Sequence, residues 1–130
     1  MELYDLRREE TMREARSWIV MEFHPESADE IVAAMSGEHS AKLRMVLSYW
    51  DMAAAFANRG AIDAEMFRDA SGELLASFCK IEPHLEGFRE KTGNPEALAH
   101  TERVASEWPG ATERMAAMRE QFREMAAARG

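Results

Sequence analysis

The chain has 130 residues, of which 46% are hydrophobic and 31% are charged, and its formal net charge is −8 at pH 7. This length suits a single domain, expected over residues 1–130, and the balance of apolar and charged residues excludes a disordered chain. An acidic chain repels phosphate backbones and anionic lipid surfaces, so we expect neither nucleic acid nor a membrane as a partner.

A first helix is predicted from about Leu3 to Phe23. The chain opens with MELYDLRREE, which is charged from its second residue and lacks the apolar core of a signal peptide. No stretch of the sequence reaches the roughly 18 consecutive apolar residues that a membrane-spanning helix needs. Because the single cysteine, Cys79, excludes an internal disulfide, the expected location is the reducing environment of the cytoplasm.

A capping signal opens the next helix. Ser27 and Glu30 form the S-x-x-E pattern of a capping box, in which each side chain bonds a backbone N–H that the helix would leave unpaired. The helix is predicted to end near Met35, where Ser36 and Gly37 break it.

The segment Ser40–Asn58, SAKLRMVLSYWDMAAAFAN, is predicted to be the helix around which the fold is organised. With about 3.6 residues per turn, its apolar side chains cover roughly two thirds of the circumference. One flank carries Leu43, Val46, Leu47, Trp50, Ala53, Ala54 and Ala57, and the other carries Met45, Tyr49, Met52 and Phe56. One neighbouring helix cannot cover both flanks. The sequence therefore predicts an all-α fold, a compact bundle of five to seven helices that encloses this segment.

Glycine, proline and capping residues divide the rest of the chain. Gly60 is placed for a left-handed cap, and Asp63 caps a helix predicted from Ala64 to about Ile81, antiparallel to the central one. Gly72, inside that helix, indicates a close helix approach or a local bend. Three more helices are predicted: one from Pro83 to Gly93, one opened by Asn94-Pro95 that carries Leu98, Val104 and Trp108, and one from about Thr112.

The last helix repeats apolar residues at alternating steps of three and four, at Met115, Met118, Phe122 and Met125. This narrow stripe on an otherwise charged helix suits either the edge of the bundle or a matching helix of a second subunit. These four residues are therefore the candidate interface of a homo-oligomer or of a complex with a protein partner.

Four stretches carry a resemblance to a known family: VLSYWDMAAAFANRG, GAIDAEMF, IEPHLEGFREKTGNPEAL and ERVASEW. From Met45 to Trp108 the sequence is similar to a bacterial family of small helical proteins catalogued only as a domain of unknown function. The likeness is looser at Phe78 and Cys79, where members of that family have aromatic residues. The resemblance implies an all-helical fold and a bacterial source, and it supplies no catalytic residues.

Asp51 is the residue of the central helix that most needs a polar partner, because an unpaired buried charge costs several kcal/mol. In one interpretation it lines a ligand-binding pocket with Tyr49, Trp50, His84 and Arg89. In the other, which we favour, it pairs with an arginine such as Arg44 or Arg89. Arg89 and Glu102 are likewise expected to form an ion pair that holds the turn at Gly93.

Metal and cofactor chemistry finds little support. Di-metal sites in helical bundles use a Glu followed three residues later by a His, a pattern that this sequence lacks. Glu96 with His100, four residues apart, is a weak candidate for one metal ion or an acid/base pair; the alternative is that Glu96 only complements the dipole of its helix. Phosphate-binding glycine loops and hydrolase or metalloprotease motifs are absent, so no cofactor is expected.

The remaining reactive side chains also point to structural roles. His24, His39 and His84 lie beside predicted helix ends or turns, where capping and surface positions are common. Cys79 has no G-x-C or C-x-x-C context and is expected to be a small buried hydrophobic residue.

These features favour a non-enzymatic cytoplasmic protein that acts through protein contact, with self-association through its first or last helix. The alternative is a small-molecule-binding protein or an enzyme with a pocket near Trp50, Asp51 and His84.

Overall fold

A computed structural model describes residues 2–61, 63–70 and 72–129. In these residues the chain forms eight α-helices and one 3₁₀ turn, with no strand. The elements are α1 (Glu2–Met21), α2 (Ala28–Ala34), α3 (Ser40–Asn58), α4 (Ala64–Ala70), α5 (Gly72–Phe78), η1 (Glu82–His84), α6 (Leu85–Thr92), α7 (Ala99–Ser106) and α8 (Ala111–Arg129). The all-α prediction is confirmed, and no helix in the described ranges is long and apolar enough to cross a membrane.

The segment predicted as one helix from Ala64 to about Ile81 is helical over α4 (Ala64–Ala70) and α5 (Gly72–Phe78). Residue 71 lies outside the described residues, and α5 begins at Gly72. A Cβ added at Gly72 would lie 3.1 Å from Nη2 of Arg114 on α8. The close approach that this glycine indicated is therefore present, and its partner is an arginine side chain.

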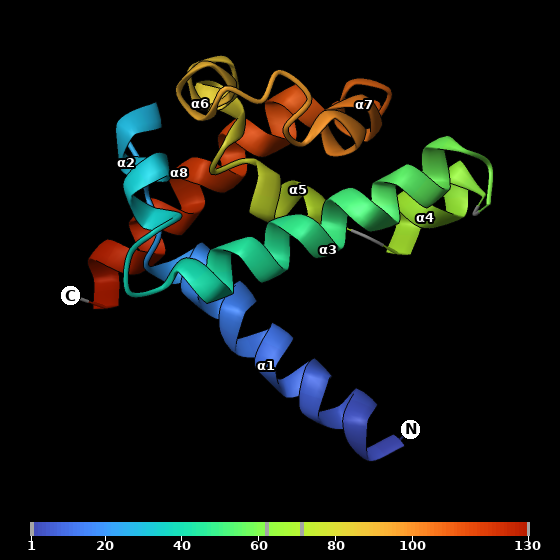
Figure 1. Cartoon of the computed structure of the whole chain (residues 1–130), viewed down its shortest axis with the longest axis horizontal. Helices are drawn as coiled ribbons and strands as arrows, with labels where there is room; N and C mark the ends of the chain where they lie inside the picture. The colour runs from blue at the N-terminus through green and yellow to red at the C-terminus, as the bar shows by residue number, and fades with distance from the viewer. Residues whose placement is uncertain (1, 62, 71, 130) are drawn as a thin grey trace.

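The long helix α3 runs through the middle of the molecule (Figure 1). Its largest contacts are with α1 and α7, while α4 and α5 run back along it, as the antiparallel prediction required. The last helix, α8, lies against α1, α5 and α7, and the short α2 packs on α6. The first half of α1 extends away from the other helices (Figure 1).

Only one of the two apolar flanks of α3 is enclosed. Leu43, Val46, Leu47, Trp50, Ala54 and Ala57 are buried, and they join one core with residues of the other helices. On the second flank Tyr49, Met52 and Phe56 are 40%, 49% and 46% exposed. The prediction that helices enclose α3 on both flanks is therefore wrong for the second flank, where these three side chains stay largely uncovered.

The predicted capping residues lie at the helix termini, as expected. Ser27 Oγ accepts the Glu30 N–H at 3.2 Å, and Glu30 Oε2 accepts the N–H of Glu26, so the capping box forms with one residue of displacement. Gly60 has φ +79°, and the N–H groups of Gly60 and Ala61 bond back to the last turn of α3 in a Schellman pattern. Asp63 Oδ1 accepts the N–H of Met66 and caps α4.

Gly60→Ala is expected to lower the free energy of unfolding by about 1 kcal/mol, since alanine is strained at positive φ. An added Cβ would meet nothing within 4 Å, so urea denaturation of this variant measures the backbone effect alone. The control is Arg59→Ala at the preceding position, where φ is −90° and the expected change is within about 0.5 kcal/mol. Equal effects of the two substitutions would contradict the left-handed cap.

The start of α7 differs from the prediction. Asn94 Oδ1 accepts the Glu96 N–H at 3.1 Å, but this closes a turn, and the helix begins only at Ala99. Leu98, expected inside the helix, instead precedes it with φ +57°, and Trp108 lies beyond the end of the helix at Ser106. Leu98 provides no side-chain cap, so the first turn of α7 depends on a partner from elsewhere.

Candidate functional site

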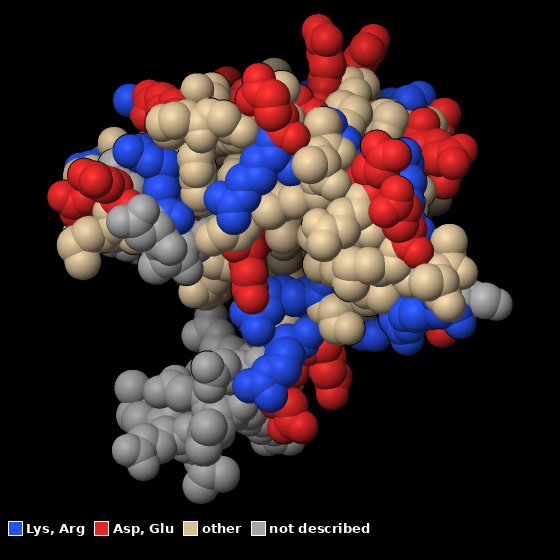
Figure 2. Space-filling view, turned by 180° about the vertical axis from the view of Figure 1, so that it is seen from behind, with Lys and Arg blue, Asp and Glu red and all other residues tan. Residues whose placement is uncertain are grey.

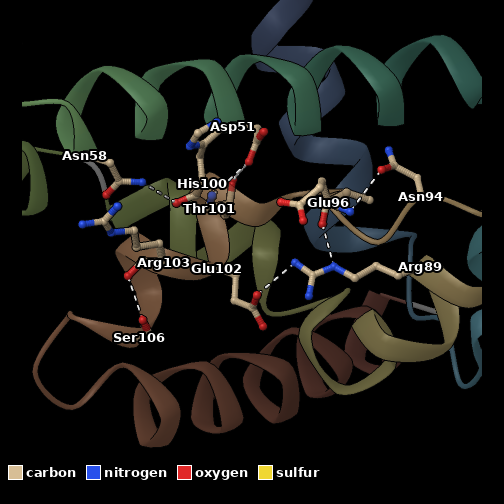
Figure 3. Close-up of polar contacts among 11 residues, drawn as sticks. Asp51, Asn58, Arg89, Asn94, Glu96, His100, Thr101, Glu102, Arg103 and Ser106 are labelled. Atoms are coloured by element: carbon tan, nitrogen blue, oxygen red, sulfur yellow. Dashed lines mark hydrogen bonds and ion pairs between the residues drawn. The ribbon is translucent and has the colours of Figure 1, made fainter.

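The partner of the first turn of α7 is Asp51. Its carboxylate oxygen Oδ1, on α3, accepts both the backbone N–H and the hydroxyl of Thr101, each at 2.9 Å (Figure 3). Thr101 is the third residue of α7 and is 3% exposed. Asp51 thus caps α7 from another helix, with its negative charge at the positive end of the helix dipole.

A second bond joins the same two helices, because Asn58 Nδ2 donates to the backbone carbonyl of His100 at 3.1 Å (Figure 3). Neither arginine that the sequence suggested is the partner of Asp51. Arg44 donates two bonds to the carbonyl of Met35, at 3.0 and 2.7 Å, and so caps the C-terminus of α2. The structural interpretation of Asp51 holds, but its partner is a helix terminus.

Arg89 spans the turn between α6 and α7, as predicted. Its Nε donates to the carbonyl of Ala97 at 2.9 Å, and its Nη2 bonds Glu102 Oε1 at 2.9 Å (Figure 3). The guanidinium therefore holds the turn at Gly93, whose φ of +70° ends α6. The predicted Arg89–Glu102 ion pair is confirmed.

The pocket suggested near Trp50, Asp51 and His84 is not assembled from these residues. Trp50 is 8% exposed and packs edge-on against Tyr49, with ring centroids 5.0 Å apart. Its buried indole N–H has no hydrogen-bond partner among the described residues. His84 lies in η1 and lines a separate cavity with His24, Lys80 and two arginines of α8.

The weak metal candidate lacks a third ligand. Glu96 is exposed and His100 is half-buried, and the described part of the chain contains no group of three or more His, Cys, Asp or Glu side chains that would hold a metal ion. Cys79 is fully buried, and its thiol donates to the carbonyl of Ala76 at 3.1 Å. Burial raises the pKa of this thiol to about 11, so it is not a nucleophile at neutral pH.

The candidate interface on α8 divides into two parts. Met115 is 3% exposed and belongs to the core, so it is not available to a partner. Met118 and Phe122 pack partly against the core, and only Met125 is well exposed, at 42%. The first half of the predicted stripe therefore docks α8 on its own bundle.

The cavity beside His84 was not found from the sequence, because its residues come from segments far apart in the chain. It has a volume of about 470 Å³ and is lined by His24, Pro25, Glu26, Lys80, Pro83, His84, Arg119 and Arg123. These residues follow the end of α1, surround η1 and lie on α8. The one usable signal was a lysine inside an otherwise apolar stretch, LLASFCKI.

Lys80 lines this cavity and is 4% exposed. Its ammonium donates to the carbonyl of Val20 in the last turn of α1 at 3.3 Å, and it lies 2.8 Å from Nδ1 of His24. Nε2 of His24 is 3.2 Å from the carbonyl of Met21. A carbonyl can only accept, so Nε2 carries the proton and Nδ1 accepts from Lys80, which requires a neutral imidazole.

The electrostatics agree with this arrangement. Burial lowers the pKa of His24, and the nearby Lys80 ammonium lowers it further. Burial also lowers the pKa of Lys80 to about 8, and Arg123 adds to that effect. Lys80 is therefore mostly charged at neutral pH, although burial destabilises its charged form.

The two arginines of α8 differ in their partners. Arg119 Nη1 donates to the carbonyl of Cys79 at 2.9 Å and approaches Glu82 Oε2 at 3.4 Å. Arg123 forms no ion pair or hydrogen bond with any described residue, and the same is true of the His84 side chain. The cavity therefore brings together three cationic side chains and leaves two groups free to bind.

The face of the molecule seen from behind carries charges of both signs (Figure 2). Seen from behind, the molecule shows Lys and Arg side chains interspersed with Asp and Glu side chains (Figure 2).

The comparison with known families agrees with the resemblance noted in the sequence. Residues 1–108 match the family described as domain of unknown function (DUF4760). The chain belongs to this family. The DUF4760 match starts well before Met45 and includes α1 to α7, with Asp51, Lys80 and Thr101, whereas α8 with Arg119 and Arg123 follows it. No curated protein and no solved structure matches the chain significantly.

Proposed function

We propose that this DUF4760 protein is a non-enzymatic module that acts through protein contact and associates with a second copy of itself through the outer flank of α3. The observation that carries the proposal is the exposure of Tyr49, Met52 and Phe56, between 40% and 49%, on one face of a single helix. Large apolar side chains that gather on one surface mark interaction sites more often than scattered ones do. The proposal therefore uses α3 for self-association, in place of the first or last helix that the sequence suggested.

The spacing on α3 suits a two-fold contact. Tyr49 precedes Met52 by three residues and Phe56 follows it by four, so the three side chains form one stripe with Met52 at its centre. In a two-fold interface each copy presents the same patch. Two antiparallel α3 helices that cross at Met52 would place Tyr49 opposite the partner's Phe56, and both aromatic rings would leave water.

The proposed setting is the cytoplasm of a bacterium. It rests on the family resemblance of the sequence and on the single cysteine, which suits a reducing compartment. The alternative function, a small-molecule-binding protein or an enzyme near Trp50 and Asp51, loses its suggested pocket, because Asp51 is engaged in capping α7 while His84 and Arg89 line two other cavities.

Met52→Asp tests the proposal. A carboxylate at the centre of the stripe would have to be desolvated in the dimer, so the dissociation constant of the dimer should rise at least about tenfold. Sedimentation velocity over a range of concentrations measures it, with circular dichroism to check that the variant folds. Because Met52 is half exposed, its replacement leaves the core intact.

The matched control is Met125→Asp, an exposed methionine on α8 and a member of the stripe predicted there. We expect it to leave self-association unchanged. A chain that is monomeric at every accessible concentration would refute the proposal. Dissociation by Met125→Asp but not by Met52→Asp would instead assign the interface to α8.

A further inference from the structure

We propose that the cavity around Lys80, His84, Arg119 and Arg123 binds the oxyanion group, phosphate or carboxylate, of a small molecule. Its volume of about 470 Å³ lies within the usual range for small-molecule pockets. The proposal goes beyond self-association and uses residues on another part of the molecule than the α3 stripe.

The charge inside the cavity is opposite to that of the chain. Three permanent or near-permanent cations, Lys80, Arg119 and Arg123, line it against one carboxylate, that of Glu26. Glu82 lies outside the lining and already bonds Arg119. Even with both carboxylates counted, a positive excess remains in a protein of net charge −8, and an anion would neutralise it.

Lys80 supplies a buried donor on the lining of the cavity. A buried ammonium needs acceptors, and its three N–H groups find only two, the Val20 carbonyl and His24 Nδ1. The ring of Phe122 lies 5.1 Å from the nitrogen and covers it from the α8 side. No third acceptor is recorded for it among the described residues, so an oxyanion in the cavity would complete its hydrogen bonds.

A purely structural explanation covers only part of the cluster. Lys80 and His24 satisfy carbonyls at the end of α1 and thereby cap that helix. This accounts for the presence of a cation, but not for Arg123 and His84, whose side chains form no hydrogen bond or ion pair with any described residue and line the same cavity. Arginine is the side chain best suited to grip phosphate and carboxylate groups.

The titratable and charged groups around Lys80 come from every element packed there. They are His24 and Glu26 after α1, Cys79, Glu82 and His84 around η1, and Arg119 and Arg123 on α8. Of these, Lys80 is the group that loses its charge near pH 8. Anion affinity should therefore fall as pH rises from about 7 to about 9.

The test is a titration of the full chain with sodium sulfate, followed by NMR chemical shifts of the backbone and arginine side chains, at constant ionic strength set with sodium chloride. Sulfate is the probe because it keeps its double charge over this pH range. Sodium acetate in a second titration distinguishes a carboxylate site from a phosphate-like one. We expect saturable shifts at residues 24, 80, 84, 119 and 123 and a weaker affinity at the higher pH.

Two variants with the same loss of charge make the test specific. Arg123→Gln should weaken sulfate binding about tenfold or more, the value of one charge-assisted contact. Arg103→Gln, on α7, removes an arginine that is also exposed and that pairs with Glu107 outside the cavity, and it should change nothing.

No saturable shift at the residues of the cavity with either anion would refute the proposal, and so would equal weakening by Arg123→Gln and Arg103→Gln, which would show general screening. Neither variant touches the α3 stripe, so failure here leaves the self-association proposal standing, and the reverse also holds.

Discussion

Asp51→Ala is expected to lower the free energy of unfolding by about 3 kcal/mol. The substitution leaves two donors of Thr101 without an acceptor, its backbone N–H and its hydroxyl, in a residue that is 3% exposed. Each unsatisfied buried donor costs about 1–3 kcal/mol, and the charge that complements the dipole of α7 is lost as well. Urea denaturation, followed by circular dichroism, measures the change.

Asp29→Ala is the matched control, because Asp29 is an exposed carboxylate whose ion pair with Lys91 lies on the surface. Its loss should cost no more than about 1 kcal/mol. Thr101→Val, which removes the hydroxyl but keeps the N–H, should fall between the two. If Asp51→Ala were no more harmful than Asp29→Ala, the cap that joins α3 to α7 would not contribute to stability.

Lys80 should make the stability of the protein rise with pH. Its pKa is about 8 in the folded chain against 10.5 for an ordinary lysine, so between these values the unfolded chain binds more protons. The contribution of Lys80 to stability is therefore least favourable below about pH 8, where the buried ammonium must stay charged, and it becomes more favourable toward pH 10.5. With allowance for screening by solvent, the rise attributable to Lys80 is about 1–2 kcal/mol.

The difference between the wild type and Lys80→Met isolates this effect, since methionine has a similar shape and no charge. Measured by urea denaturation in buffers without sulfate or phosphate, the wild type should gain stability relative to Lys80→Met between about pH 7.5 and about pH 10. Lys42→Met, which removes a lysine from the start of α3, should retain the rise. A constant difference between wild type and Lys80→Met would show that Lys80 is not destabilised by burial.

The helices themselves could be predicted because their signals are local. Ser27, Gly60, Asp63 and Gly93 act on neighbouring backbone groups, and the structure finds each of them at a helix end. The bounds of α3 are those predicted, from Ser40 to Asn58, because its apolar periodicity is long and uninterrupted. The Arg89–Glu102 pair could also be predicted from the sequence, since only the turn between α6 and α7 separates the helices that carry the two residues.

What could not be predicted depends on contacts between distant segments. Periodicity showed that α3 has two apolar flanks, but which flank faces α1 and α7 depends on how those helices pack. The partner of Asp51 lies 50 residues away in the chain, and no local pattern marks it. The same is true of Lys80 and His24, which are 56 residues apart.

The sequence by itself determined the family, the central helix and the helix ends marked by local capping residues, since these follow from side chains acting on their own or adjacent turns. Only the tertiary structure decided that Asp51 caps a helix, that Met52 stays exposed and that Lys80 is buried among arginines. The physical reason is that burial and electrostatic environment are properties of neighbours in space. Helix packing determines those neighbours, and the spacing of residues along one helix does not show how the helices pack.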